Sequence, residues 1–121
     1  MNKTQEAMNQ LMRCASFNNF DGDMVADNLE DNHNLFRGYV FGRFDYATLI
    51  PLRDIENDVY NADTLYILPA PDKEDELEKL VRDTFKADEV DWESEADIQK
   101  EMGFGGRTSN SDKYVLRVWW D

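Results

Sequence analysis

The sequence predicts a small α+β domain in which a mainly antiparallel sheet of roughly three or four strands packs against three or four helices. Segments with helical and with strand periodicity alternate along the chain, and 41% of its 121 residues are hydrophobic. This length favours one domain over residues 1–121 with a usable core. Asp and Glu outnumber Lys and Arg by 26 to 13, but aromatic residues make up 12% of the chain, more than disordered acidic tails contain. We therefore expect a folded domain that carries surplus acid.

The first third of the chain is expected to form two helices joined by a turn. An amphipathic helix over residues 3–16 is indicated by apolar side chains three or four positions apart, namely Met8, Leu11, Met12 and Ala15. Residues 18–22 supply turn-forming side chains. A short helix over residues 23–31 would then place Val25 and Leu29 on one side.

The middle of the chain is expected to contain two strands and a short helix. Residues 35–50 are rich in aromatic and β-branched side chains, and one long strand and a hairpin both fit them. Pro51 can occupy the first turn of a short helix, whose inward-facing side chains would be Leu52, Ile55 and Val59. Residues 64–68 predict a buried strand that Pro69 and Pro71 close.

The clearest helix of the sequence covers residues 72–86. Asp72 can cap it, acidic residues crowd its first turn, and Arg82 and Lys86 near its end suit the helix dipole. Its inner side would be formed by Leu77, Leu80, Val81, Thr84 and Phe85. Such a helix can cover one face of the predicted sheet.

The end of the chain is expected to add two more strands. Residues 89–93 look extended, while Ser94 and Asp97 match a capping box. Residues 94–97 could continue the strand or begin a helix, and we favour a helix that runs to Met102 and stops at Gly103. A loop over residues 104–112 and a closing strand with alternating apolar side chains over 114–120 complete the expected fold.

Catalytic and metal-binding patterns are not apparent, so we expect no enzyme activity, no metal and no cofactor. The one histidine, His33, lies in an Asn- and Asp-rich segment typical of a solvated surface. Cys14 adjoins the apolar stripe of the first helix and is expected to be a packed thiol. The acids around Gly22 do not have the spacing of a calcium-binding EF-hand loop. The Gly-rich segment 103–107 lacks the Lys-Ser/Thr pair of a phosphate-binding loop.

The net charge of −13 indicates which partners the protein can have. A charge of this sign repels nucleic acids and anionic membranes and attracts basic protein surfaces, so we expect neither direct nucleic-acid nor membrane binding. The polar first ten residues lack the apolar region of a secretory signal, and no apolar run approaches the roughly 18 residues of a membrane span. With a single cysteine, these features favour the cytoplasm.

An uninterrupted acidic segment between Asp88 and Asp97 carries most of the functional information. From Glu89 onward the acids occupy every second position, with Val90 and Trp92 between the first of them. In an extended chain, residues two apart share a face and lie about 7 Å apart, which approaches the phosphate spacing along one nucleic-acid strand. The strand-spaced acids would thus form a row on one face, with Val90 and Trp92 anchoring the other.

A second acidic group lies in residues 21–31, in a segment without basic residues between Arg13 and Arg37. Charge runs are most often solvated surfaces, but clustering like charge raises self-repulsion that folding must overcome. We therefore expect a bent acidic ridge formed with the flank of the helix over 72–86. The candidate partner-binding residues are Asp88, Glu89, Asp91, Glu93, Glu95, Asp97 and Glu101, with Asp21, Asp23, Asp27, Glu30 and Asp31 in the second group.

These properties favour an acidic inhibitor that binds a basic, nucleic-acid-binding protein, such as a nuclease or a CRISPR effector complex. The inhibitor would mimic nucleic-acid charge and compete for the Lys and Arg residues that contact phosphates. The small, acidic chain resembles, as a functional class, the phage-encoded DNA mimics among anti-restriction and anti-CRISPR proteins. One alternative is an immunity protein that neutralises a basic toxin, and another is a housekeeping domain or enzyme.

Overall fold

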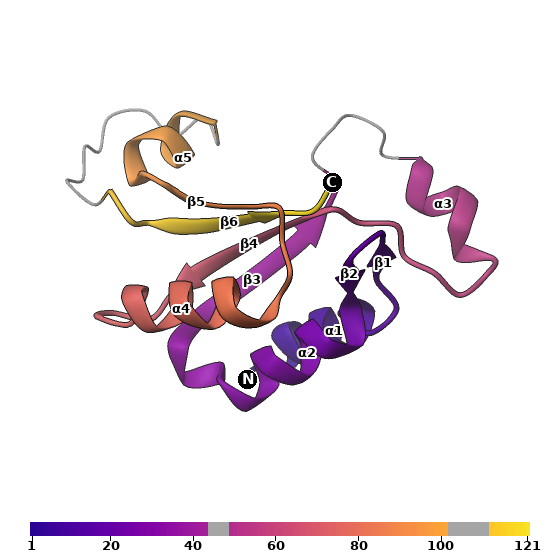
Figure 1. The fold of residues 1–121 in the computed structure, drawn as a ribbon, viewed down its shortest axis with the longest axis horizontal. Coiled ribbons are helices and arrows are strands. Elements are labelled where there is room, and N and C mark those ends of the chain that lie inside the picture. The colour runs from indigo at the N-terminus through magenta and orange to yellow at the C-terminus, as the bar shows by residue number, and fades with distance from the viewer. Residues whose placement is uncertain (44–48, 102–111) are drawn as a thin grey trace.

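A four-stranded antiparallel sheet forms the centre of the molecule in the computed structural model, which describes residues 1–43, 49–101 and 112–121 (Figure 1). The sheet order is β3-β4-β6-β5, so β3 and β5 are its edges. The strands are β3 (Phe36–Gly42), β4 (Thr64–Pro69), β5 (Glu89–Glu93) and β6 (Val115–Trp119). A two-stranded ribbon of β1 (Ser16–Phe17) and β2 (Phe20–Asp21) lies beside it. The predicted α+β class and the mainly antiparallel sheet are confirmed.

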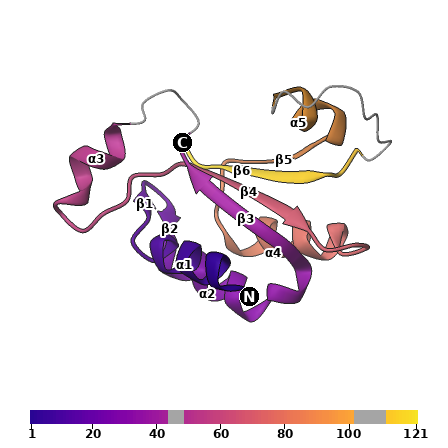
Figure 2. The same ribbon diagram turned by 180° about the vertical axis from the view of Figure 1, so that it is seen from behind.

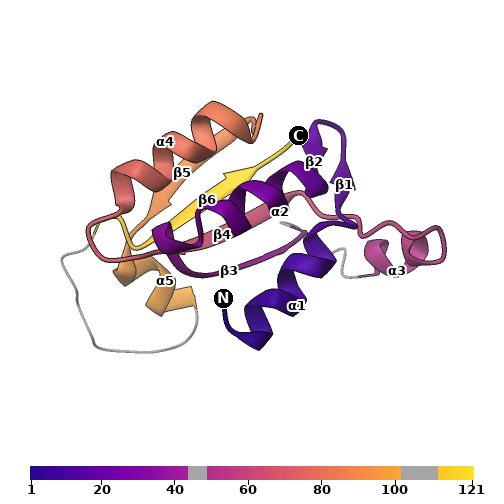
Figure 3. The same ribbon diagram turned by 90° about the horizontal axis from the view of Figure 1, so that it is seen from below.

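Helices lie on both sides of this sheet but cover only one side well. The helices of the described residues are α1 (Lys3–Met12), α2 (Gly22–Asp31), α3 (Ile50–Ile55), α4 (Glu74–Thr84) and α5 (Glu95–Glu101), with a 3₁₀ turn, η1 (His33–Leu35). Helices α4 and α2 lie on one side, with α4 beneath β5 and β6, and α1 lies next to α2 along the edge strand β3 (Figures 1 and 3). On the other side α5 follows β5, whereas α3 projects away from the end of the sheet (Figures 1 and 2).

The core fills the space between the sheet and the helices α2 and α4. Helix α4 contributes three fully buried side chains at helical spacing, Leu77, Val81 and Phe85, as its sequence predicts. Trp120 is fully buried directly after β6 and stacks on Phe20, with ring centroids 4.0 Å apart. Its indole Nε1 donates to the Phe85 carbonyl at 3.0 Å, which ties the end of the chain to α4. The inner faces of β4 and β6 supply Leu65, Ile67, Leu116 and Val118.

The first helix ends earlier than its apolar spacing indicates. It stops at Met12, and the predicted continuation to residue 16 is wrong because the chain turns there to meet α2. The Ala15 carbonyl accepts a hydrogen bond from the Gly22 amide at 3.1 Å, so the second helix starts directly against this turn. The turn also leaves Cys14 exposed rather than packed, contrary to our expectation.

Two further expectations about helix surroundings are wrong. Leu52 and Ile55 were expected to face inward, but they are 65% and 59% exposed, because α3 projects from the body of the protein (Figure 2). Asp72 does not cap α4. Residues 71–72 form a turn in which Asp72 has a left-handed φ of 64°, so the helix begins only at Glu74.

The competing interpretations of residues 94–97 are resolved in favour of the helix. Strand β5 ends at Glu93, and the Ser94 hydroxyl accepts a hydrogen bond from the Asp97 amide at 3.2 Å. Residues 36–42 form one strand, and residues 44–48, on which a hairpin would depend, lie outside the described residues. The predicted helix stop at Gly103 and the loop over 104–111 also lie outside them.

Candidate acidic binding surfaces

The acidic row predicted from the sequence lies along edge strand β5. Glu89, Asp91 and Glu93 alternate with Val90 and Trp92, so the three carboxylates share one face of the sheet. Val90 is buried and Trp92 packs against the core on the opposite face. The strand is thus anchored from behind and holds its acids toward the side of the sheet that α4 does not cover.

Arg117 on the neighbouring strand β6 lies against this row. Its Nη1 is 3.1 Å from a Glu89 carboxylate oxygen and 3.3 Å from one of Asp91. The arginine side chain is only 13% exposed, whereas those of Glu89 and Asp91 are 51% and 60% exposed. Arg117 therefore reduces the net charge of the row while it restrains two of its carboxylates, which remain accessible.

Polar contacts with α4 hold the inner face of β5. The Trp92 indole Nε1 donates a hydrogen bond to the Glu78 carboxylate, and the Arg82 guanidinium donates to the Val90 carbonyl at 2.8 Å. Arg82 Nε also lies 3.0 Å from the other Glu78 oxygen. The hydrogen bond from Trp92, with a further one from Arg82, lowers the pKa of Glu78 below its ordinary value. The charged form of Glu78 thus helps to position the acidic strand.

We predict that this attachment weakens in acid. Because the pKa of Glu78 is lower in the folded than in the unfolded protein, its contribution is complete above the unfolded pKa of about 4.3. The contribution is lost as the pH falls through the lower, folded pKa. The NMR shift of the Trp92 indole proton should therefore titrate with a midpoint below the ordinary pKa of a glutamate side chain. Glu78→Gln should abolish this titration, and a midpoint above that ordinary pKa would contradict the prediction.

The remaining acids of the first group lie at the two ends of the row. Asp88 accepts a hydrogen bond from the Asp121 amide at 2.8 Å and so also holds the chain end. Glu95 is half-buried and Asp97 is exposed in the first turn of α5, where the helix takes them out of the line of the strand. Glu101 is the last residue of α5, and its side chain lies outside the described residues.

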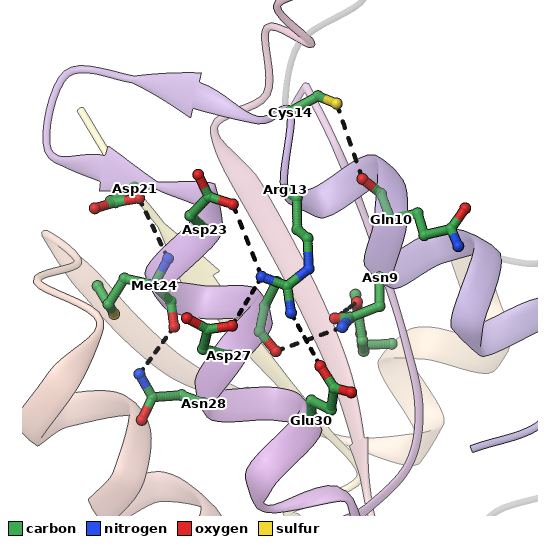
Figure 4. Close-up of polar contacts among 12 residues, drawn as sticks. Asn9, Gln10, Arg13, Cys14, Asp21, Asp23, Met24, Asp27, Asn28 and Glu30 are labelled. Atoms are coloured by element: carbon green, nitrogen blue, oxygen red, sulfur yellow. Dashed lines mark hydrogen bonds and ion pairs between the residues drawn. The ribbon is translucent and has the colours of Figure 1, made fainter.

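The second acidic group surrounds Arg13, which directly follows α1 (Figure 4). Asp23, Asp27 and Glu30 lie along one side of α2, with oxygens 3.8, 2.8 and 2.9 Å from the Arg13 guanidinium. Asp21 instead caps α2 by accepting a hydrogen bond from the Met24 amide. Asp31 is exposed at the end of the helix. The hydrogen bond from Arg13 to Asp27 is the main reason why the pKa of Arg13 is raised, so the guanidinium stays charged within this group.

The structure does not join the two groups into a continuous acidic ridge. The first lies on β5 and α5, and the second lies on α2, in the helical layer on the other side of the sheet (Figures 1 and 3). Residues 72–86, expected to supply the flank of the ridge, contain six acids and four basic residues. Several of these charges form local pairs, such as Lys73 with Glu76. A bent ridge along α4 is therefore not supported, and the two groups are separate surfaces.

Sequence reasoning missed the surface that adjoins the first group. On the face that carries Asp91, the cross-strand partners in order are Arg117, Tyr66 and Val40, and Val40 is 56% exposed. A cleft of about 490 Å³ hollows this face, bordered by residues of α1 and by Ile98 of α5. The signal lay in residues 64–69 and 115–119, where apolar side chains occupy both faces instead of alternating with polar ones.

Catalytic and membrane features of the described residues are limited. His33 is exposed, as expected, with Nδ1 3.1 Å from the Glu30 carbonyl oxygen. Within residues 1–43, 49–101 and 112–121, no group of three or more His, Cys, Asp or Glu side chains is arranged to hold a metal ion. In the same residues no helix has the length and apolar character needed to cross a bilayer. A polar hollow of about 590 Å³ adjoins the second acidic group and is lined by Glu6, Glu30 and Arg13, among others.

The fold and these surfaces define the chain as an acidic α+β domain with two arginine-centred carboxylate groups and an incompletely covered sheet. No protein-family model matches the chain, and no curated protein or solved structure is significantly similar to it.

Proposed function

We propose that the protein is an acidic inhibitor that binds a basic, nucleic-acid-binding protein by mimicking nucleic-acid charge. Its target class would be a nuclease or a CRISPR effector complex, and its place of action the cytoplasm. The row of Glu89, Asp91 and Glu93 on β5 is the observation that carries the proposal. A strand holds these carboxylates about 7 Å apart on one face, a spacing close to that of successive phosphates.

Restraint of the acids by arginine supports the same proposal. A side chain that is ordered before binding loses less conformational entropy when it meets its partner. Nη1 of Arg117 contacts one carboxylate oxygen of Glu89 and one of Asp91, and a carboxylate has about four lone-pair positions for hydrogen bonds. Both acids can therefore accept further bonds from a partner's Lys and Arg, while the net charge of −13 favours rapid encounter with a basic surface.

An affinity pull-down at two salt concentrations tests the proposal. We expect the tagged protein to capture a nucleic-acid-binding protein from host lysate at low salt, and high salt to weaken the complex. Added DNA or RNA should compete for the captured protein, because both would occupy the same basic surface. Capture that is insensitive to nucleic acid would contradict mimicry.

An immunity protein that blocks a basic toxin is the second candidate, because an aromatic side chain adjoins the acidic row. Trp119 on β6 is the cross-strand partner of Glu89 and is half-buried on the same face. Aromatic side chains beside charged groups are frequent binding hot spots. Capture of a toxin in a complex that nucleic acid does not disrupt would favour this candidate. An enzyme finds less support, since none of the described residues that line the cleft of about 490 Å³ is acidic.

A further inference from the structure

The face of the sheet that the described helices leave open combines an apolar floor with one acidic border. From the β5 edge inward, Asp91, Arg117, Tyr66 and Val40 face the same side in successive strands. Val115, Leu68 and Gly38 also line the cleft on this side. Negative charge is thus concentrated at the β5 edge, and the side chains that follow on β4 and β3 are aromatic or apolar as far as Arg37 at the opposite border.

The floor is hollowed where β3 lacks side chains. Among the described residues, a methyl group at Gly42 would meet no atom within 4 Å, and one at Gly38 would meet only the tip of Gln5, at 3.2 Å. Between these glycines Val40 stands 56% exposed, so an apolar side chain borders an open space of about 490 Å³. A sheet buries such a face by packing another layer of secondary structure against it.

Helices α1 and α5 form the two walls of this cleft. The Gln5 side chain fixes α1 to the edge of β3, since its Oε1 accepts a hydrogen bond from the Tyr39 amide at 2.9 Å. Ile98 lines the cleft from α5. An α-helix with its side chains is about 10 Å across, which is about two strand spacings of 4.8 Å. A helix laid over β3 and β4 would therefore place one flank toward the acids of β5.

The charges on the two borders of this face indicate which flank of such a helix should be basic. Glu89, Asp91 and Glu93 lie on the β5 side, and long Lys or Arg side chains can reach them while their stems cover apolar surface. On the β3 side the cleft is lined by Arg37, an exposed cation whose Nε donates to the Pro69 carbonyl at 2.9 Å. A basic flank fits the first border and is disfavoured at the second.

We propose that this face receives an amphipathic α-helix of the partner, with an apolar side on Val40 and Leu68 and a basic flank toward β5. The inference rests on the proposed function, because it specifies an α-helix as the part of the basic target that the inhibitor binds. Charge mimicry alone would make the contact purely electrostatic, whereas a bound helix also buries apolar surface. Because salt does not screen the burial of apolar surface, part of the binding affinity should persist at high salt.

A synthetic peptide tests the inference without a known target. The probe is a labelled peptide of about four helical turns, with Leu on one side and Lys on one flank only. The comparison peptide has the same composition in scrambled order. Fluorescence anisotropy should give at least tenfold tighter binding for the amphipathic peptide, and NMR shifts should map to Val40, Leu68 and Ile98. Equal affinity of both peptides, or absence of binding by either, would overturn the inference.

Matched variants separate this face from general charge effects. Val40→Glu should weaken binding of the amphipathic peptide about tenfold or more, a loss of about 1.4 kcal/mol. Leu52→Glu adds the same charge at a similarly exposed residue of α3 and should leave binding unchanged. An unchanged affinity of Val40→Glu, with its fold intact by circular dichroism, would overturn the inference. If the pull-down captures a basic partner equally well with Val40→Glu, this inference fails while the proposed function stands.

Discussion

Simultaneous reversal of Glu89, Asp91, Glu93 and Glu95 to Lys is expected to abolish capture of the partner. Each substitution replaces an attraction to the partner's basic groups with a repulsion, and like charges brought together at an interface cost several kcal/mol. Four such changes should weaken binding by about 1000-fold or more, which corresponds to about 4 kcal/mol. The measurement is the dissociation constant of the captured complex at low and at high salt.

Two companion variants make this result interpretable. Reversal of Glu89 and Asp91 places new cations beside Arg117, so a neutral variant with Gln and Asn at the four positions tests binding with less strain. A matched control reverses the exposed acids Glu56, Glu76, Asp83 and Asp112 and thereby changes the net charge by the same amount. We expect the control to retain most of the affinity. Full binding by either four-residue variant of the row would exclude the row as the contact site.

Local patterns were sufficient to predict most of the fold. The apolar side chains alternate along β5 and follow helical spacing along α4 because one side of each element faces the core. The side that faces the core can be inferred from neighbouring residues of the same element. The Ser94 cap was predictable for the same reason, because its hydrogen bond spans only three residues. The errors at Cys14, Leu52 and Ile55 arose where long-range packing determines exposure. A helix can have apolar residues and still project from the body, as α3 does (Figures 1 and 2).

The candidate site was predicted in its acids but not in its arginines. Arg13 and Arg117 lie 14 and 26 residues along the chain from Asp27 and Asp91, whose carboxylates accept hydrogen bonds from them. Only tertiary structure brings such distant charges together. A count of charges along the chain therefore made both acidic groups look free of basic neighbours, although each contacts an arginine in the fold. For the same reason the sequence could not show that the groups lie on different sides of the sheet.

These arginines change the kind of recognition that the acids can provide. A row of mobile carboxylates would bind any polycation weakly, because each side chain must be ordered on contact. Carboxylates restrained by a half-buried guanidinium give up part of their attraction but present a defined geometry. An arrangement of this kind favours discrimination between partners over non-specific binding to positive charge.

Substitution of Gly22 by Ala is expected to destabilise the protein more than any other single methyl addition among the glycines that the structure describes. A Cβ at this position would lie 2.0 Å from the Met12 carbonyl oxygen and 2.5 Å from that of Ala15. Both atoms belong to the backbone of the turn after α1, so no side chain can rotate away. Helix α2 would have to move from α1, which would break the hydrogen bond from the Gly22 amide to Ala15.

The free energy of unfolding of Gly22→Ala should fall by about 4 kcal/mol or more, a size that single substitutions reach only through severe overpacking or comparable defects. Denaturant unfolding followed by circular dichroism measures the change. Gly42→Ala is the matched control, because its added methyl group meets no atom of the described residues within 4 Å and should alter stability by less than about 1 kcal/mol. A similar loss of unfolding free energy in both variants would show that Gly22 is not required by the close approach of α1 and α2. Because Arg13 and the acids of α2 meet across this same junction, a substitution that moves α2 away from α1 should also separate the Arg13 guanidinium from Asp27 and Glu30.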